Sequence, residues 1–541
     1  MALFSTHKIK GSFVQRMPSL HHEHGSYRWW VLFNVMIGTF MAVLDATVVN
    51  VALPKIMATF GINVDKAEWI LTVYLLVFAV MLPTSGWVAD HFGYKRTYFL
   101  ALFLFTLGSF LCGLAWDENV LIIFRIIQAT GAGFLMPVGM AIITREFPVE
   151  QRGIALGFWS IAAAASVSLG PLIGGYLVDN IGWNAIFDVN VPVGFVGLFA
   201  TLVIQREYKT EKARSFDIVG FISSAVFLGA LLLALSDGNA SWNTGGWSSP
   251  FIVSCFFISA FALVVFLFTE LTVEHPLIEL KLLRNFNFGV TNAILFIFGL
   301  GMFGSTFLLP LYLQNSLGYT ALQAGAVFLP VGILQAFTAP IAGILSDRVN
   351  PKIPAAIGLS LLALSLLLNA SLSLFSEHHQ IMLPLYIRGF AMGLVFTPLS
   401  TLALSEIPRH KIAQASGLFN VLRQLGGSFG VALMGALLTR RIIYHTAMYG
   451  QMVDPHSPAF QQVTARLTHF SQHAVGGTVG LSAMRANALV ATNIVQQAFV
   501  QAINDDFLVA AGITALTLIP IFLLRSHRQR ARKKEQQTTT K

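Results

Sequence analysis

The sequence is poor in charge and in cysteine. Asp, Glu, Lys and Arg make up 11% of its 541 residues, whereas soluble domains carry roughly 25%. Hydrophobic residues make up 55%, which excludes an ordinary soluble enzyme and a disordered protein. The two cysteines, Cys112 and Cys255, lie inside apolar runs and form neither a C-x-x-C motif nor a metal-ligand pattern. A disulfide scaffold is therefore excluded as well.

Several functional motifs are also missing from the sequence. It contains no phosphate-binding G-x-x-x-x-G-K-[ST] motif, so an ATP-driven pump is not expected, and no pattern indicates an enzyme. The first 28 residues are polar and basic and hold no short apolar segment with a cleavage site, so no cleavable signal peptide is predicted. The HHEH tract at 21–24 resembles a metal-binding sequence, but it lies in this polar tail and we predict no metal site.

Long apolar runs dominate the remaining sequence. A helix that crosses a bilayer needs ~20 apolar residues. We predict an all-α integral membrane protein with fourteen such helices, at about 29–53, 68–88, 97–115, 119–142, 155–178, 186–204, 217–236, 250–270, 287–312, 322–345, 353–374, 381–401, 413–438 and 507–524.

The basic residues between these runs predict the orientation. In a soluble protein a net charge of +9 would suggest nucleic acid, but in a membrane protein Lys and Arg mark the cytoplasmic side. Every second connection is basic, whereas the turns near 116–118, 179–185, 237–249, 313–321 and 375–380 contain no Lys or Arg. Only Lys55 and Lys66 depart from this pattern. We therefore expect both termini in the cytoplasm and no nucleic-acid partner.

Three features recur with offsets of 257, 263 and 260 residues. G-x-x-x-D occurs at Gly86/Asp90 and again at Gly343/Asp347. A span with Arg near its outer end occurs at Arg125 and again at Arg388, and each such span is followed by a proline. This repeat predicts two homologous six-helix bundles with two helices inserted between them, an architecture of secondary transporters whose substrate site lies between the halves.

The predicted organisation follows from the repeat and the composition. It consists of a cytoplasmic tail at 1–28, a first bundle at 29–205, two inserted helices at 206–272, a second bundle at 273–525 and a basic cytoplasmic tail at 526–541. The second bundle contains an external segment at 441–505, whose end around 485–503 has amphipathic periodicity. This segment is either a functional loop or an extension of the last two spans.

Two ionisable residues lie inside the apolar spans of the first half. Asp45 and Arg125 are both roughly 9–14 Å below the outer surface, at 1.5 Å per residue. A buried charge costs at least ~2.5 kcal/mol, so each needs a partner or a wet cavity. The pair serves either proton coupling or a structural role. Asp188, at the outer start of the sixth span, is a second proton-site candidate, or simply an interfacial carboxylate.

Other polar residues in the spans are candidates for the wall of a central cavity; these are Asn50, Gln128, Arg388, Asn420 and Arg423. For Arg423, a role in holding the two halves together is equally open.

Several segments resemble motifs of the fourteen-span drug:proton antiporter family of the major facilitator superfamily, the family of EmrB-like multidrug efflux permeases. They are LDATVVNVALP (44–54), GWVADHFGYKR (86–96), RIIQATGAG (125–133), GPLIGG (170–175), PLIELKLLRNFNF (276–288) and GLFNVLRQLGGSFG (417–430). The sequence departs from the family at His91 and Tyr94, where basic residues are usual, and at Asn184 and Ala185, which replace Arg-Trp.

The resemblance implies roles for individual residues. Asp45 and Arg125 would serve proton coupling, and Asp90 would help to latch the cytoplasmic gate. The rest of the gating set would be Gly86, Gly93, Lys95 and Arg96 in the turn, and Gly170, Pro171, Gly174 and Gly175 in the fifth span, where the motif favours exchange. The long external segment is similar to that of members that work with a periplasmic adaptor and an outer-membrane channel.

These observations predict a proton-coupled exporter of hydrophobic or amphipathic compounds in the inner membrane, driven by the proton gradient without a cofactor. Two alternatives stay open. One is an exporter of a specific metabolite such as a siderophore, a lipid or a fatty acid. The other is a non-transporting membrane sensor or scaffold, against which the retained Asp45 and Arg125 argue.

Overall fold

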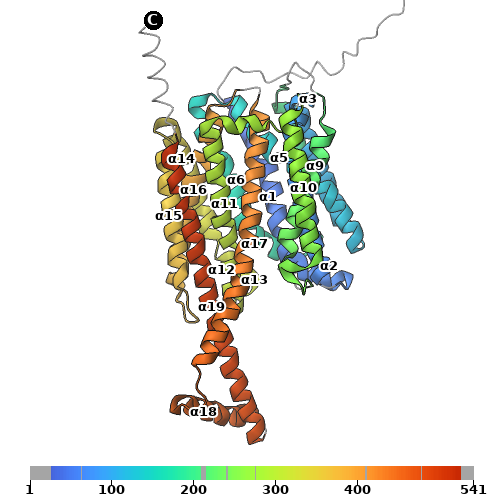
Figure 1. Cartoon of the computed structure of the whole chain (residues 1–541). Coiled ribbons are helices and arrows are strands. Elements are labelled where there is room, and N and C mark those ends of the chain that lie inside the picture. Colours follow the sequence, from blue (N-terminus) through green and yellow to red (C-terminus); the bar gives the residue numbers. More distant parts are fainter. Residues whose placement is uncertain are drawn as a thin grey trace, which may run out of the picture.

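A computed structural model describes residues 26–524, apart from positions 63, 209–214, 239, 241, 275, 409–410 and 477. The described part of the chain is almost entirely α-helical and contains no strand (Figure 1). The HHEH tract at 21–24 and the basic tail lie outside the described residues.

The first half of the chain forms the spans that were predicted for it. Its helices are α1 (Ser26–Phe60), α2 (Val64–Met81), α3 (Ser85–Phe92), α4 (Tyr94–Gly113), α5 (Glu118–Glu146), α6 (Arg152–Asn180), α7 (Ala185–Asp188) and α8 (Asn190–Ile204). The inserted pair is α9 (Ile218–Asp237) and α10 (Pro250–Thr272).

The second half repeats this arrangement with longer terminal helices. They are α11 (Phe286–Thr306), α12 (Leu308–Leu317), α13 (Ala321–Ala326), α14 (Leu329–Arg348), α15 (Lys352–Leu368), α16 (His378–Ser405), α17 (Ile412–Met452), α18 (Pro458–Val475), α19 (Val479–Leu516) and α20 (Leu518–Leu523). Short 3₁₀ turns at Val149–Gln151, Gly246–Ser248, Leu280–Arg284 and Asn369–Ser371 complete the described structure.

The number of helices agrees with the predicted number of spans. Within the described residues, twelve helices are long and apolar enough to cross a membrane, and two bent pairs bring the number to fourteen. The bend between α2 and α3 is 56°, and α6 bends by 42° between its segments 149–167 and 172–180. The latter bend contains the Gly170-Pro171 step, where proline removes a backbone hydrogen bond.

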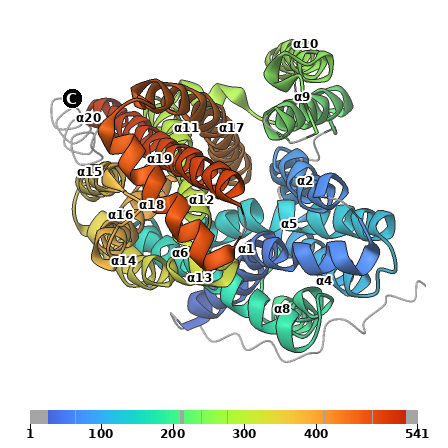
Figure 2. The same cartoon turned by 90° about the horizontal axis from the view of Figure 1, so that it is seen from below.

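The inserted helices lie beside the two bundles. Figure 2 shows α9 and α10 packed on each other at the edge of the molecule, next to α2 and α17. Many of their side chains remain exposed, such as Phe257, Phe261 and Phe268, as expected for helices in lipid. The main buried cluster is formed by residues from both halves.

The two halves contact each other closely at the end of the molecule where α3 lies. We call this the basic end, because Lys95, Arg96 and Arg206 lie there, and the opposite end, where α18 lies, the protruding end (Figure 1). The carboxylate of Asp347 in α14 accepts hydrogen bonds from the backbone N–H groups of Gly153 (2.9 Å) and Ile154 (3.0 Å) at the start of α6. A helix N-terminus has unpaired N–H groups and favours negative charge, so Asp347 links the halves electrostatically.

The two repeated G-x-x-x-D motifs occupy similar positions. A Cβ atom at Gly343 would lie 2.3 Å from the carbonyl oxygen of Gly153, and one at Gly86 would lie 2.8 Å from Cα of Gln414, near the start of α17. Each glycine thus allows its helix to approach the N-terminus of a span in the other half.

The segment 441–505, predicted to be external, is mostly helical. Residues up to Met452 continue α17, and residues from Val479 onward belong to α19 (Figure 1). The amphipathic stretch 485–503 therefore belongs to α19, as the extension of the last two spans predicts, while α18 is a separate helix that was not predicted. A function of this segment stays a prediction.

The glycine contact between the halves predicts a stability effect. Gly343→Ala places a methyl group against the backbone of Gly153, and overpacking of this kind costs about 1–3 kcal/mol. Gly229→Ala is the matched control, because nothing lies within 4 Å of a Cβ at that position. We expect thermal unfolding in detergent to show a lower midpoint for Gly343→Ala only, and equal midpoints for the two variants would contradict the described contact.

Candidate functional site

Asp45 lies near the middle of α1 and has no solvent-exposed surface. Its side chain faces the interior of the first bundle, where α2, α4, α5 and α8 contribute polar or aromatic groups. Arg125 in α5 is 1% exposed and forms an ion pair with Asp45 through Nη1 and Oδ2. The structure therefore brings together the two ionisable residues that the sequence placed at matched depth.

Arg125 has partners besides Asp45. Nη1 also donates to Oε1 of Gln128 at 2.7 Å, and Nε donates to the carbonyl oxygen of Ile70 at 3.4 Å. The guanidinium carbon lies 4.1 Å from the centre of the Tyr74 ring, a favourable position for a cation over an aromatic face. The phenol of Tyr74 is fixed in turn by a 3.1 Å hydrogen bond to the carbonyl oxygen of Ala42.

Asp45 also accepts hydrogen bonds from two amides. Nε2 of Gln128 donates to Oδ1 of Asp45 at 2.8 Å and to Oγ of Ser109 at 2.7 Å, and Nδ2 of Asn190 lies 3.5 Å from the same Oδ1. Gly108 makes this arrangement possible, since a Cβ there would lie 2.5 Å from Cα of Gln128. The close approach of α4 and α5 positions Ser109 beside the amide.

This network supplies the partners that an ionised Asp45 needs. In a low-dielectric interior an ionised carboxylate needs a counter-ion and hydrogen-bond donors, and Arg125, Gln128 and Asn190 supply them. If Asp45 takes up a proton, Arg125 still contacts Gln128, Ile70 and Tyr74. The arginine therefore retains partners in either protonation state of the acid.

Of the other residues predicted to form the site, Gln128 lies beside Asp45 and Asp188 does not. Gln128, expected in a cavity wall, lies fully buried in the Asp45 network. Asp188 is exposed and lies against Gly113, where a Cβ would be 2.2 Å from Oδ1 of Asp188. Asp188 is not among the groups bonded to Asp45 in the described structure.

Sequence analysis missed three members of the network: Tyr74, Ser109 and Asn190. Each is a polar or amphipathic residue inside an apolar span. Asn190 could have been noticed because an amide in a span needs a partner, but serine and tyrosine are too common in such helices to be distinctive.

The turn between α3 and α4 is held by a residue that the sequence did not indicate. Gly93 has φ of +99°, which favours glycine, and the carboxylate of Glu207 accepts hydrogen bonds from the backbone N–H groups of Lys95 (3.1 Å) and Arg96 (3.3 Å). The ammonium group of Lys95 donates to the carbonyl oxygen of Leu202 at 2.7 Å. Asp90 is buried and accepts a hydrogen bond from the Tyr94 hydroxyl at 3.1 Å.

The connection after α8 closes over this turn. The carbonyl oxygen of Tyr208 accepts a hydrogen bond from the Tyr94 backbone N–H at 3.0 Å. Burial, and then the negative charge of Glu146, raise the pKa of Tyr208 to about 12. Its phenol therefore stays neutral at physiological pH.

The remaining candidates for the cavity wall differ in how far they are buried and in which helix they contact. Asn420 is 1% exposed, and its amide nitrogen lies 3.9 Å from Sδ of Met140. Nη2 of Arg423 lies 3.9 Å from Sδ of Met136, so both residues of α17 contact α5 across the boundary between the halves. Asn50 is exposed on α1, whereas Arg388 is buried in α16.

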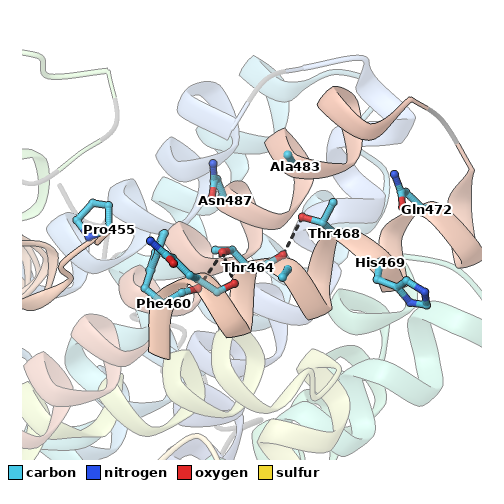
Figure 3. Close-up of a pocket in the computed structure, with 10 residues that line it drawn as sticks. Pro455, Phe460, Thr464, Thr468, His469, Gln472, Ala483 and Asn487 are labelled. Atoms are coloured by element: carbon cyan, nitrogen blue, oxygen red, sulfur yellow. Dashed lines mark hydrogen bonds between the residues drawn. The ribbon is translucent and has the colours of Figure 1, made fainter. Parts of the chain in front are cut away.

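A pocket outside the spans lies between α18 and the beginning of α19 (Figure 3). It has a volume of about 550 Å³ and polar lining residues such as Thr464, Thr468 and Asn487. It belongs to the protruding end and is separate from the Asp45 network. Among the described residues, no three His, Cys, Asp or Glu side chains are grouped to hold a metal ion.

Comparison with known proteins gives consistent matches. The profile of the Major Facilitator Superfamily matches residues 35–218 and 210–431. The chain is 31% identical over 515 residues to "Uncharacterized MFS-type transporter YhcA" of Bacillus subtilis, covering 94% of this chain and 95% of that protein. It is 32% identical over 487 residues to "Multidrug export protein EmrB" of Haemophilus influenzae, covering 89% and 93%.

A solved structure shows the same fold. The crystal structure of the human organic anion transporter MFSD10 (TETRAN) superposes with a TM-score of 0.59 and 15% identity, covering 92% of this chain and 99% of that chain.

The contacts of Asp45 predict a non-additive stability effect. Arg125→Gln removes the cation beside a buried carboxylate, and breaking such a pair costs about 3–5 kcal/mol. Asp45→Asn in the same chain removes the charge that needs the cation, so the double variant should recover part of this loss. Denaturant unfolding in detergent measures the free energies, and strictly additive losses would contradict the pairing.

Proposed function

The chain belongs to the Major Facilitator Superfamily, and from this premise we propose that it is a proton-coupled exporter of hydrophobic or amphipathic compounds across the inner membrane. The observation that carries the proposal is the buried Asp45–Arg125 pair inside a helix bundle of apolar spans. The name and the coverage of the multidrug export relative support the same function.

Asp45 is the proton carrier in this proposal, and Arg125 is its counter-ion. A proton that enters from the outer side neutralises Asp45 and thereby removes its ion pair with Arg125. Arg125 keeps its contacts with Gln128 and Ile70. Loss of the proton to the inner side restores the ion pair and resets substrate binding. Asp188, exposed at the start of the sixth span, is the proposed entry point for the proton.

The glycine set of α6 connects this site to the second half. A Cβ at Gly170 would lie 2.2 Å from Oγ1 of Thr47, and one at Gly174 would lie 2.6 Å from Cγ2 of Val48. Thr47 and Val48 lie two and three residues after Asp45 on α1, and Gly175 faces Leu322 of the second half. A shift of α1 on protonation therefore acts on the helix that contacts both halves, which supports a role of this motif in exchange.

The basic end is the proposed cytoplasmic gate. Gly86 of α3 packs against Gln414 near the start of α17, Asp90 of α3 accepts a hydrogen bond from Tyr94, and Asp347 accepts hydrogen bonds from the start of α6. Opening at this end must break the two hydrogen bonds of Asp347. The proposed cytoplasmic position of this end follows from its basic side chains.

The proton gradient supplies enough energy without a cofactor. One charge that moves through 100 mV yields ~2.3 kcal/mol. At ~1.4 kcal/mol per tenfold change in concentration, this sustains roughly a 50-fold gradient of the exported compound for each proton.

The protruding end is the proposed contact surface for a periplasmic adaptor, which in turn would reach an outer-membrane channel. Its helices expose apolar side chains, with Phe470 at 65% and Met484 at 71% exposure. Solvent-exposed apolar groups on a segment beyond the membrane favour a protein partner.

Asp45→Asn tests the proposed function. The substitution keeps the size of the side chain but removes its ability to carry a proton, so we expect proton-driven efflux to be abolished while expression and membrane insertion are unchanged. The measurement is dye or drug efflux from cells that lack their own pumps, with and without an uncoupler. Full efflux in the variant under a pH gradient would refute the role of Asp45.

Phe470→Ser combined with Met484→Ser tests the proposed partner. We expect cellular resistance to fall because the adaptor contact is weakened, while transport into proteoliposomes continues at the wild-type rate. Gln462→Ala, also exposed on α18, is the control and should affect neither assay. Unchanged cellular resistance in the double variant would exclude this surface.

A further inference from the structure

Arg388 is a buried cation without a partner. The residue is 2% exposed, and none of its three guanidinium nitrogens has a hydrogen-bond acceptor among the described residues. The side chains one turn away on α16, Leu385 and Ala391, are fully buried and apolar. Leaving a guanidinium in such surroundings without a counter-ion is costly, and the described residues do not supply that counter-ion.

The internal repeat shows what is missing. Arg388 lies 263 residues after Arg125, and Arg125 is neutralised by Asp45 in the first half. The three offsets of the repeat place the counterpart of Asp45 between residues 302 and 308. The sequence there is MFGSTFL, which contains no acid. The second half has therefore kept the arginine without the carboxylate.

Three acids of the second half, Asp347, Asp505 and Asp506, accept no hydrogen bond from Arg388 in the described structure. Asp347 is bonded to the start of α6 at the basic end. Asp505 pairs with Arg441 and His445 at the protruding end. Asp506 is buried, but its oxygens accept no hydrogen bond from the described residues, so it does not neutralise Arg388 either.

An apolar strip extends from Arg388 along α16. Residues four apart lie on one face of a helix, so Arg388, Met392 and Phe396 form a row that spans roughly 12 Å at 1.5 Å per residue. Met392 and Phe396 are only half-buried. The Phe396 ring lies 6.1 Å from the ring of Trp159 in α6, so the row leads to the boundary between the two halves.

We propose that Arg388 binds the anionic head group of a lipophilic organic acid whose apolar body lies along Met392 and Phe396. A carboxylate matches the planar fork of a guanidinium, which donates two parallel hydrogen bonds to it. Methionine and phenylalanine accommodate apolar bodies of different shapes. The inference rests on the proposed export function and narrows its substrates to organic acids.

A second cation at the other end of the row agrees with this class. The guanidinium of Arg423 lies 5.8 Å from the centre of the Phe396 ring, and its Nε has no acceptor among the described residues. The positive charges of Arg388 and Arg423 repel a cationic compound and attract an anionic one.

Three probes with the same body and different head groups test the site. They are naphthoate, naphthylmethanol and naphthylmethyl-trimethylammonium, and their binding to the purified full-length chain in detergent is measured by titration calorimetry. We expect naphthoate to bind most tightly. Arg388→Gln should weaken naphthoate binding about tenfold or more, the effect of losing hydrogen bonds to a charged group, and should leave binding of the neutral probe unchanged.

Two further variants complete the test. Arg284→Gln removes an exposed arginine of the α10–α11 connection and should bind all three probes as the wild type does. Arg388→Lys keeps the charge but not the fork, so we expect an intermediate loss for naphthoate, and this variant serves if Arg388→Gln does not fold.

The results distinguish the site from the transport function. A wild-type preference for the neutral or the cationic probe, or naphthoate binding that Arg388 variants leave unchanged, overturns the proposed site even if export is demonstrated. Conversely, head-group selectivity that depends on Arg388, in a protein that moves no compound, supports the site and contradicts the export function.

Discussion

A carboxylate cannot remain ionised inside an apolar helix bundle unless a cation and hydrogen-bond donors are held beside it. The arrangement of the first half follows from this constraint. Asp45 on α1 is satisfied by Arg125 and Gln128 of α5, with Asn190 of α8 nearby. Because these groups come from different helices, the contacts of Asp45 join α1, α5 and α8. The proposed uptake of a proton by Asp45 would therefore weaken contacts between helices.

The same constraint makes the two halves unequal. The repeat preserves the G-x-x-x-D motif and an arginine inside a span, and both motifs lie where the halves meet at the basic end. The acid was not preserved, so Arg125 has an internal counter-ion and Arg388 has none. This difference is the basis for the proposal that the first half carries the proton and that the second half supplies a cation for a ligand.

The sequence was sufficient for the spans and for the central pair. Long apolar runs identify the spans because a helix in lipid needs apolar side chains. An acid and an arginine at equal depth in two spans indicate an ion pair. It was insufficient where the partner is a common residue or a backbone group. Glu207 caps α4 from a distant connection, and Asn190 contacts Asp45 from a helix 145 positions away. The separate helix α18 was also missed, because a polar helix outside the apolar runs carries no hydropathy signature, whereas the extension of α17 and α19 was one of the two alternatives that the sequence left open.

In the proposed cycle, Asp45 exchanges its proton in step with binding of the exported compound. A pH-sensitive dye in weakly buffered detergent measures proton release from the purified protein when a transported compound is added. We expect the wild type to release a proton as the compound binds, and Asp45→Asn to bind the compound without any release. Equal release by both proteins would show that a group other than Asp45 carries the proton.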